Sequence, residues 1–291
     1  MSDKKTILIV GADSDLGTSL ANYLNQNLYE LVFTSRKKNP PLKCIQYLDL
    51  SDKDSIENLN LEGIEVSVIC ASITDQKKCE EDPMHTYNIN VEGTLKLIER
   101  LSKNNVHIIF PSTSLVYDGA YPFQGSADSP NPKGKYASYK YEVEKEILKS
   151  YSSHATILRL SKLITINYPL FLEWHSALSE NKKIFPFGDL LFSPISINFA
   201  AQVIERIIQD KIFDTLNLSA INEISYYDAL TYIAKNSGFS VSKITEGSAK
   251  IKLPDLFLPS HSTLDTSQLE NLGIIIPPSE YALDFFINEI T

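Results

Sequence analysis

The sequence predicts an α/β protein with a doubly wound, parallel, Rossmann-type sheet and a smaller C-terminal lobe. Short apolar segments alternate with helix-like segments through the first 165 residues, and this alternation is typical of a parallel sheet covered by helices on both faces. A glycine-containing loop, residues 11–17, joins the first apolar segment to the first helix-like one. Beyond residue 160 the alternation loosens, which indicates a second part with a different architecture.

The apolar segments of the first half are expected to be strands, because they are short and rich in β-branched residues. They are residues 6–10, 31–33, 44–48, 66–71, 106–110 and 155–160. Apolar residues at helical spacing predict the helices between several of these strands, at 16–28, 84–101 and 136–151. We therefore expect consecutive β-α units in this half of the chain.

The second half predicts several helices and few strands. We expect helices at 168–180, 198–209 and 226–235, with Ser225 as the N-cap of the third, and a last helix that begins near Ser279. From these patterns we assign 1–165 to a dinucleotide-binding domain, to which 195–220 returns, and 166–194 with 221–291 to a smaller substrate-binding lobe.

The composition is that of a globular protein, and it excludes several classes of partner. The 291 residues carry a net charge of −9 and no basic stripe, so a nucleic acid is not expected to bind. No apolar stretch approaches the roughly 18 residues of a membrane span, and no membrane contact is expected. The three cysteines have no Cys-x-x-Cys spacing and the five histidines lie far apart. We therefore expect no metal site and a reduced, cytoplasmic compartment.

The loop after the first strand has the spacing of a phosphate-binding turn. Gly11 would permit the tight turn and Gly17 the close packing of helix on strand, while free N–H groups at the helix start attract a phosphate. Ser14 stands where such loops carry their middle glycine. We predict Gly11, Ser14, Asp15, Leu16 and Gly17 as cofactor-binding residues; the alternative is an ordinary strand-to-helix turn.

The end of the second strand distinguishes between two dinucleotides. An NAD site usually carries an acidic residue there, whereas this chain has Ser35 and Arg36, which suit a 2′-phosphate. We therefore predict NADP (as NADPH) as the cofactor, with NAD as the alternative; a solvated basic turn would have the same sequence. The ends of the next two strands supply the remaining predicted cofactor contacts: Asp49, Leu50, Cys70, Ala71 and Ser72.

The strongest chemical signal is Tyr136 with Lys140, one helical turn apart on a predicted helix. A tyrosine has a pKa of about 10, and a fixed ammonium beside it is expected to lower this pKa and to permit proton exchange near neutral pH. Tyr141 and Lys145 repeat the spacing, so spacing alone does not decide between the pairs. Helical phase places Tyr136 and Lys140 on the face of Val143, towards the protein, and the second pair on the solvated face.

A third candidate lies at the end of the fifth strand, where residues 112–114 are Ser, Thr and Ser. Hydroxyl groups at the carboxyl end of a parallel strand face the ligand crevice. We predict that one of these hydroxyl groups, by preference that of Thr113, donates a hydrogen bond to the carbonyl oxygen on which charge develops. The alternative is a turn whose hydroxyl groups only cap the backbone.

Together these motifs resemble the extended short-chain dehydrogenase/reductase family. Its marks are the glycine loop, the hydroxyl residue on the fifth strand, Tyr-x-x-x-Lys, and a helix signature Asn-Val-x-Gly-Thr, here residues 90–94. Within that family the sequence is similar to the dTDP-4-dehydrorhamnose reductases through residues 112–119 and 261–269. It departs from their pattern at Ser14, at Ser114 in place of an aspartate, and at Tyr139, where Ser or Thr usually precedes the lysine.

The resemblance implies an NAD(P)-dependent oxidoreductase that reduces the keto group of a 4-keto-6-deoxy nucleotide sugar, in cell-surface polysaccharide biosynthesis. It implies that Tyr136 protonates the oxyanion, that Lys140 supports the tyrosine and the cofactor ribose, and that Thr113 orients the carbonyl. It also implies a homodimer.

Two alternative functions stay open. One is a non-catalytic, NADP-binding regulatory subunit similar to the methionine adenosyltransferase β-subunit, and the other is a nucleotide-sugar epimerase. Three further side chains have two interpretations each. Asn90 is expected to be structural rather than a proton relay, and Tyr168 and Trp174 either cover the substrate or belong to the core.

Overall fold

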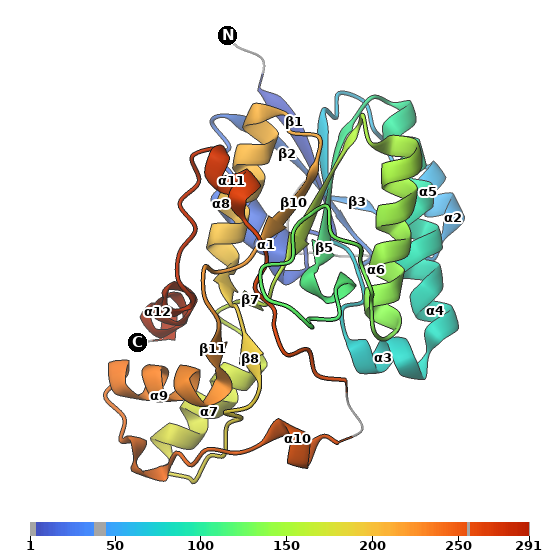
Figure 1. The fold of residues 1–291 in the computed structure, drawn as a ribbon. Helices are drawn as coiled ribbons and strands as arrows, with labels where there is room; N and C mark the ends of the chain where they lie inside the picture. Colours follow the sequence, from blue (N-terminus) through green and yellow to red (C-terminus); the bar gives the residue numbers. More distant parts are fainter. Residues whose placement is uncertain (1–3, 38–44, 255–256, 291) are drawn as a thin grey trace. The chain divides into compact units, whose positions relative to one another are not determined.

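The computed structural model describes residues 4–37, 45–254 and 257–290 (Figure 1). The chain divides into two compact units. The first consists of Met1–Val116, Pro130–Arg159 and Ala201–Leu216, and the second of Tyr117–Ser129, Leu160–Ala200 and Asn217–Thr291. Within the described part of the chain, no helix has both the length and the apolar character that crossing a membrane requires.

A seven-stranded sheet has the strand order β10-β6-β5-β4-β1-β2-β3. Its strands are β1 (Lys5–Val10), β2 (Tyr29–Ser35), β3 (Ile45–Tyr47), β4 (Val66–Ile69), β5 (His107–Thr113), β6 (Ala155–Leu160) and β10 (Thr215–Leu218). Strand β1 runs parallel to both neighbours, with Ile7 opposite Leu31 on β2 and Val66 on β4. The predicted doubly wound parallel sheet is confirmed, and its chain order reverses between β1 and β4. Cys44, the predicted start of the third strand, lies outside the described residues.

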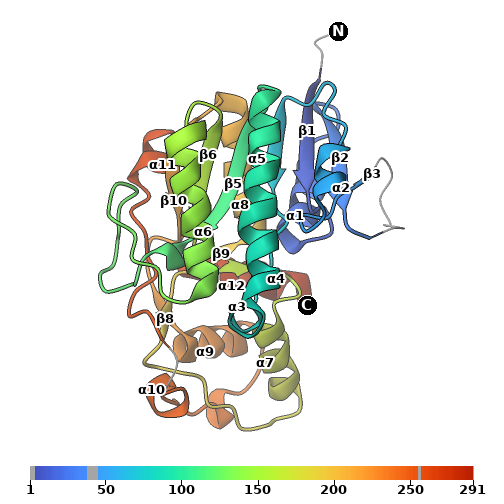
Figure 2. The ribbon, with the colours of Figure 1, turned by 90° about the vertical axis from the view of Figure 1, so that its right-hand side faces the viewer.

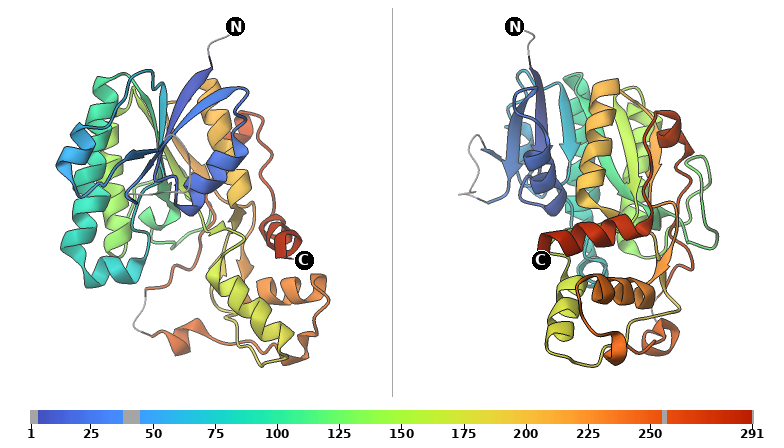
Figure 3. Two further views of the ribbon diagram at one scale, coloured as in Figure 1. Left: turned by 180° about the vertical axis from the view of Figure 1, so that it is seen from behind. Right: turned by 90° about the vertical axis from the view of Figure 1, so that its left-hand side faces the viewer.

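Helices cover both faces of this sheet. The helices α5 and α6 lie side by side over one face (Figure 2), and α1 and α8 lie over the other (Figure 3). The helices of this part of the chain are α1 (Asp15–Tyr23), α2 (Lys53–Glu57), α3 (Gln76–Glu81), α4 (Pro83–Tyr87), α5 (Thr94–Lys103), α6 (Lys135–Glu146) and α8 (Ile197–Asp210). Leu8 and Ile108 of the sheet share one fully buried core with Leu97 of α5 and Val143 of α6. This double cover explains why the strands are apolar throughout.

Several segments differ from the sequence prediction. The helix predicted at 136–151 is α-helical only as far as Glu146 and continues as a π-helical turn. The first helix ends at Tyr23 rather than at 28, because Leu24 adopts an extended conformation. The helix predicted at 84–101 is interrupted by a π-helical turn, η1 (Asn88–Gly93), between α4 and α5. Strand β10 is absent from the prediction, because its Asn217 is polar and yet buried. The remaining short turns are η2 (Ser114–Val116), η3 (Ile147–Tyr151) and η4 (Val241–Lys243).

The second unit has its own apolar core. Its elements are β7 (Leu163–Ile164), β8 (Leu191–Phe192), β9 (Ile195–Ser196), β11 (Ile224–Ser225), α7 (Pro169–Ser179), α9 (Tyr226–Asn236), α10 (Ala249–Lys252), α11 (Ser267–Asn271) and α12 (Ser279–Ile290). Phe171 stacks on Trp174 at 5.1 Å between ring centroids and contacts Tyr168 edge-on at 4.9 Å. Of the two residues proposed to cover a substrate, Trp174 therefore belongs to this core and the partly buried Tyr168 packs against it. Ser225 is the N-cap of α9 as predicted, its Oγ accepting from the Asp228 N–H at 3.0 Å.

Candidate cofactor and catalytic site

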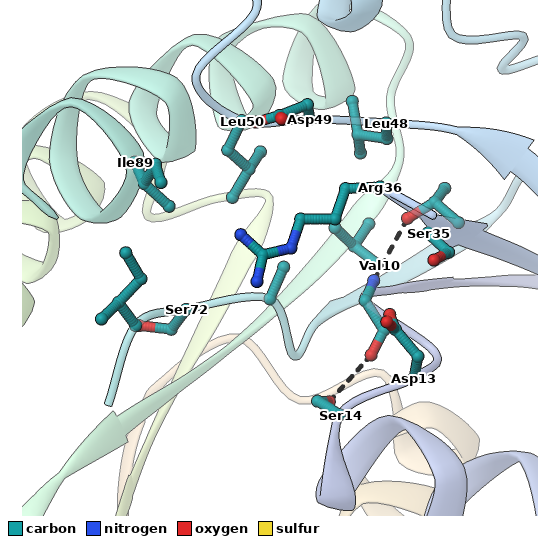
Figure 4. Close-up of a pocket in the computed structure, with 14 residues that line it drawn as sticks. Val10, Asp13, Ser14, Ser35, Arg36, Leu48, Asp49, Leu50, Ser72 and Ile89 are labelled. Atoms are coloured by element: carbon teal, nitrogen blue, oxygen red, sulfur yellow. Dashed lines mark hydrogen bonds between the residues drawn. The ribbon is translucent and has the colours of Figure 1, made fainter. Parts of the chain in front are cut away.

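A pocket of about 190 Å³ lies in the first unit, at the carboxyl ends of β1, β2 and β4 (Figure 4). The strand order reverses between β1 and β4, and such a point is where doubly wound sheets bind their ligands. Segments that follow four strands, together with one helical turn, form its wall. The lining residues are Val10, Gly11, Asp13, Ser14, Thr34, Ser35, Arg36, Leu48, Asp49, Leu50, Ala71, Ser72, Ile73 and Ile89.

The glycine loop lines the pocket with Gly11, Asp13 and Ser14. Close backbone contacts hold this loop in place. Gly11 has a φ of +77°, and a Cβ there would lie 2.8 Å from the Cα of Ala71. A Cβ at Gly17 would lie 2.3 Å from the carbonyl oxygen of Gly11, so the helix can approach the strand only with glycine at that position. The Ser14 Oγ donates to the Gly11 carbonyl at 2.8 Å and accepts from the Gly17 N–H at 3.1 Å. Ser14 therefore acts as the N-cap of α1.

A Gly17→Ala substitution is expected to reduce the free energy of unfolding by about 1–3 kcal/mol, because the new methyl group overlaps a backbone oxygen. Gly125→Ala is the matched control, since the nearest atom to its added Cβ is 3.7 Å away. Urea unfolding of both variants measures the difference. Equal stabilities would contradict the close packing of α1 on the β1 loop.

Arg36 extends into the pocket from the end of β2, between Leu50 and the segment that carries Ser72 (Figure 4). Asp49 lies on the same wall, where its Oδ1 accepts hydrogen bonds from the N–H and the hydroxyl of Ser51 at 2.8 and 2.6 Å. Burial raises the pKa of Asp49, but these hydrogen bonds and the charge of Arg36 outweigh burial, so the pKa lies below its usual value. The pocket lining thus includes one guanidinium, that of Arg36, and two carboxyl groups, those of Asp13 and Asp49.

Asn90 fixes the segment after β4. Its Oδ1 accepts from the Ile73 N–H at 2.8 Å and from the Ser72 hydroxyl at 3.1 Å, and its Nδ2 donates to the Ile73 carbonyl at 2.9 Å. The residue lies in the π-helical turn η1, a local geometry that is frequent at functional sites. These contacts agree with the structural role expected for Asn90, which is to hold two lining residues of the pocket in place.

Lys140 is buried between α6 and the sheet. Its Nζ donates to the Pro111 carbonyl oxygen at 2.9 Å and lies 4.5 Å from the ring centroid of Phe110, both on β5. Burial lowers the pKa of Lys140 to about 8, although Cys70 and Glu144 act in the opposite direction. An ammonium in this position can switch its charge within a pH unit or so of neutrality.

Tyr136 differs from the sequence expectation in its acidity. Its pKa is raised, mainly because burial penalises the phenolate and secondarily through Cys79, so the expected lowering by Lys140 is wrong for this structure. The ammonium instead engages the Pro111 carbonyl. The expected facing of the helix is confirmed for the two lysines, since Lys140 is buried with Val143 while Lys145 is exposed and lies over the ring of Tyr141. The side chains of Tyr136 and Tyr141 are both half-buried.

Thr113 is the last residue of β5, the strand against which α6 packs. Its Oγ1 accepts from the Leu115 N–H at 3.2 Å and so begins the turn η2. Capping uses an oxygen lone pair and leaves the hydroxyl proton for another acceptor. The capping interpretation and the carbonyl-binding interpretation of Thr113 are therefore compatible.

The pocket brings together most of the predicted cofactor residues. They are Gly11, Ser14, Ser35, Arg36, Asp49, Leu50, Ala71 and Ser72. Asp15, Leu16, Gly17, Cys70 and Lys140 do not line it, and their contact with a cofactor stays a prediction. Thr34 also lines the pocket, where its Oγ1 accepts from the Gly11 N–H at 3.1 Å, and the sequence prediction did not include it. A hydroxyl residue near the end of a predicted strand could have indicated this role. The apolar lining residues Ile73 and Ile89 had no such signal.

The fold and the site define a class of protein. A doubly wound sheet, a glycine loop between β1 and α1, a hydroxyl residue ending β5 and a Tyr-x-x-x-Lys helix packed on that strand together define an extended short-chain dehydrogenase/reductase. Over residues 5–291 the chain matches the family model described as RmlD substrate binding domain. The chain belongs to this family, which confirms the resemblance stated from its motifs.

Individual relatives are distant in sequence. The chain is 22% identical to methionine adenosyltransferase 2 subunit beta of Bos taurus, over 93% of this chain and 83% of that protein. It is 27% identical to dTDP-4-dehydrorhamnose reductase of Aggregatibacter actinomycetemcomitans, over 69% of this chain and 68% of that protein. The solved structure of dTDP-4-dehydrorhamnose reductase from Bacillus anthracis in complex with NADP matches with a TM-score of 0.88 at 20% identity, over 99% of this chain and 100% of that one. At this identity the structural match establishes the fold.

Proposed function

We propose that the chain is an NADPH-dependent reductase of the keto group of a 4-keto-6-deoxy nucleotide sugar, similar to dTDP-4-dehydrorhamnose reductase. The observation that carries the proposal is the buried ammonium of Lys140, held by the Pro111 carbonyl one helical turn from Tyr136. Burying a lysine costs free energy, and perturbed groups of this kind cluster at functional sites. A role in polysaccharide biosynthesis, a cytoplasmic location and a homodimer are part of the same proposal.

The pocket residues fit the phosphate and adenosine parts of a dinucleotide. Gly11 and Ser14 of the loop line the pocket at the N-terminus of α1, where N–H groups favour a phosphate. Arg36 supplies a planar, charged donor set for a 2′-phosphate. Bound NADPH would supply the hydride for the keto carbon.

The chain's own residues would handle the proton and the developing charge. The raised pKa of Tyr136 keeps its phenol protonated at neutral pH, which is the state that a proton donor to the new alkoxide requires. Thr113 would donate its free hydroxyl proton to the carbonyl oxygen and hold it during the reaction. The ammonium of Lys140, which the Pro111 carbonyl holds one helical turn from Tyr136, would donate to the ribose hydroxyl groups of the cofactor.

The activity is tested by following NADPH absorbance with a panel of 4-keto-6-deoxy nucleotide sugars bearing different nucleotides. We expect oxidation of NADPH with at least one of them and a reduced sugar as the product. An epimerase would instead return an isomer without net NADPH consumption. Failure of every sugar, in a protein that binds NADPH, would overturn the proposed reaction.

A second candidate function is favoured by the similarity, over 93% of the chain, to methionine adenosyltransferase 2 subunit beta. In this case the chain would bind NADP and associate with a methionine adenosyltransferase catalytic subunit without reducing a sugar. Size-exclusion chromatography of a mixture with such a subunit, with and without NADP, tests this function. A stable complex together with no turnover would favour the regulatory subunit over the reductase.

Arg36→Ala is expected to reduce the preference for NADPH over NADH by about ten- to a hundred-fold. The change removes charge-assisted hydrogen bonds to the 2′-phosphate, each worth about 1.5–3 kcal/mol. Lys103→Ala is the control, because Lys103 is exposed and its Nζ pairs with the Glu99 Oε1 at 2.6 Å on α5, and neither residue lines the pocket. Dissociation constants for both dinucleotides measure the ratio, and an unchanged ratio in Arg36→Ala would contradict its assignment to the 2′-phosphate.

A further inference from the structure

A fully buried ion pair joins α6 to β6 in the first unit. The Arg159 Nη2 lies 2.7 Å from the Glu144 Oε2, and its Nε lies 3.2 and 3.1 Å from the two carboxylate oxygens. The two side chains are 2% and 0% exposed. Such a pair contributes little net stability, because desolvation of both charges offsets their attraction. Its presence in the core therefore calls for another explanation.

The position of the pair relative to Lys140 supplies one. Glu144 lies one turn beyond Lys140 on α6, so the two side chains share a helix face, and both are buried. The other groups around the ammonium are the Pro111 carbonyl and the Phe110 ring on β5, Cys70 after β4, and Tyr136 on the same helix.

None of those other groups is an anion at neutral pH. Burial raises the pKa of the Cys70 thiol to about 12, so that it stays uncharged, and the phenol of Tyr136 stays protonated for the same reason. In the described part of the chain, Glu144 is thus the anion that acts on Lys140. Arg159 in turn holds that carboxylate in place and compensates its charge.

We propose that Glu144 and Arg159 are positioning residues that set the charge state of Lys140, Glu144 favouring its ammonium form and Arg159 limiting that effect. The inference rests on the proposed function, in which the ammonium of Lys140 holds the cofactor ribose. Burial alone would favour the neutral amine of Lys140, and the field of Glu144 opposes burial. Without Arg159 the carboxylate would act on Lys140 uncompensated.

The two members of the pair therefore have opposite expected effects. Glu144→Gln should lower the pKa of Lys140 by roughly one unit, and Arg159→Gln should raise it by a similar amount. The double variant should lie between Glu144→Gln and the unmodified protein. Glu146→Gln is the matched control: it removes the same charge from the same helix, but Glu146 pairs with Lys149 near the surface and should leave Lys140 unchanged.

The measurement is an NMR titration of ¹³Cε-labelled lysines in the full chain, with the Lys140 signal assigned by its loss in Lys140→Met. Opposite shifts in the two single variants support the inference, whereas shifts of the same sign, or shifts no larger than that of Glu146→Gln, overturn it. If Arg159→Gln does not fold, the pKa of Lys140 in Glu144→Gln and in the double variant tests the inference instead. The pKa must then fall in the first and return towards the unmodified value in the second.

Turnover gives an independent readout. If the ammonium is the active form, activity is lost as pH rises through the pKa of Lys140, so the basic limb of the kcat profile should move down in Glu144→Gln and up in Arg159→Gln. The titration uses no substrate, so an absent sugar reduction leaves its result intact and overturns only the proposed function. A fixed Lys140 pKa in variants of an active reductase would overturn only this inference.

Discussion

Tyr136→Phe is expected to lower kcat by about 10²–10⁴-fold while leaving NADPH binding within a factor of two or so, because it removes a proton donor and keeps the ring. The raised pKa of Tyr136 makes the phenol a donor at neutral pH, so the loss should appear in the reduction of the sugar and not in the affinity for the cofactor. Stopped-flow reduction and fluorescence titration with NADPH separate the two quantities.

Tyr141→Phe is the control that the chain itself supplies. Tyr141 and Lys145 repeat the spacing of the proposed pair, but Lys145 is exposed and contacts the Tyr141 ring at 5.2 Å from its centroid. We expect this variant to retain its turnover. Turnover that survives in Tyr136→Phe and disappears in Tyr141→Phe would show that the proton donor lies on the other face of α6.

The sheet could be predicted because its strands are apolar on both faces, and this pattern is a property of each short segment alone. Details that depend on contacts between segments distant in the sequence could not be predicted in this way. The π-helical turn η1 contains Gly93, where a Cβ would lie 1.8 Å from the carbonyl oxygen of Leu50. This packing is set by the approach of two segments more than forty residues apart, and helical spacing carries no sign of it.

The candidate site was predictable to a similar extent. Loops that follow strands supplied Gly11, Arg36 and Asp49, because the ends of parallel strands meet at one edge of the sheet. The acidity of Tyr136 was not predictable, since the neighbouring lysine is visible in the sequence but the burial of the phenol is not. Arg159 lies in an otherwise apolar predicted strand, which indicates that its charge has a buried partner. The sequence does not identify this partner as Glu144.

Arg159→Gln is expected to reduce the free energy of unfolding by about 3–5 kcal/mol, because it leaves the fully buried carboxylate of Glu144 without its counter-charge. Combining it with Glu144→Gln should recover most of this loss, since two neutral amides can hydrogen-bond without any buried charge. The pair therefore predicts strong non-additivity in a double-mutant cycle measured by urea unfolding.

Arg206→Gln is the control for the loss of an arginine as such. Arg206 pairs with Asp210 on the surface of α8, where the two side chains are 46% and 36% exposed, so its loss should cost less than about 1 kcal/mol. If Arg159→Gln reduces the free energy of unfolding no more than Arg206→Gln does, another group compensates the charge of the buried Glu144 carboxylate. The effect of Glu144 on the pKa of Lys140 would then not depend on Arg159. Glu144→Gln and Arg159→Gln could therefore not shift this pKa in opposite directions.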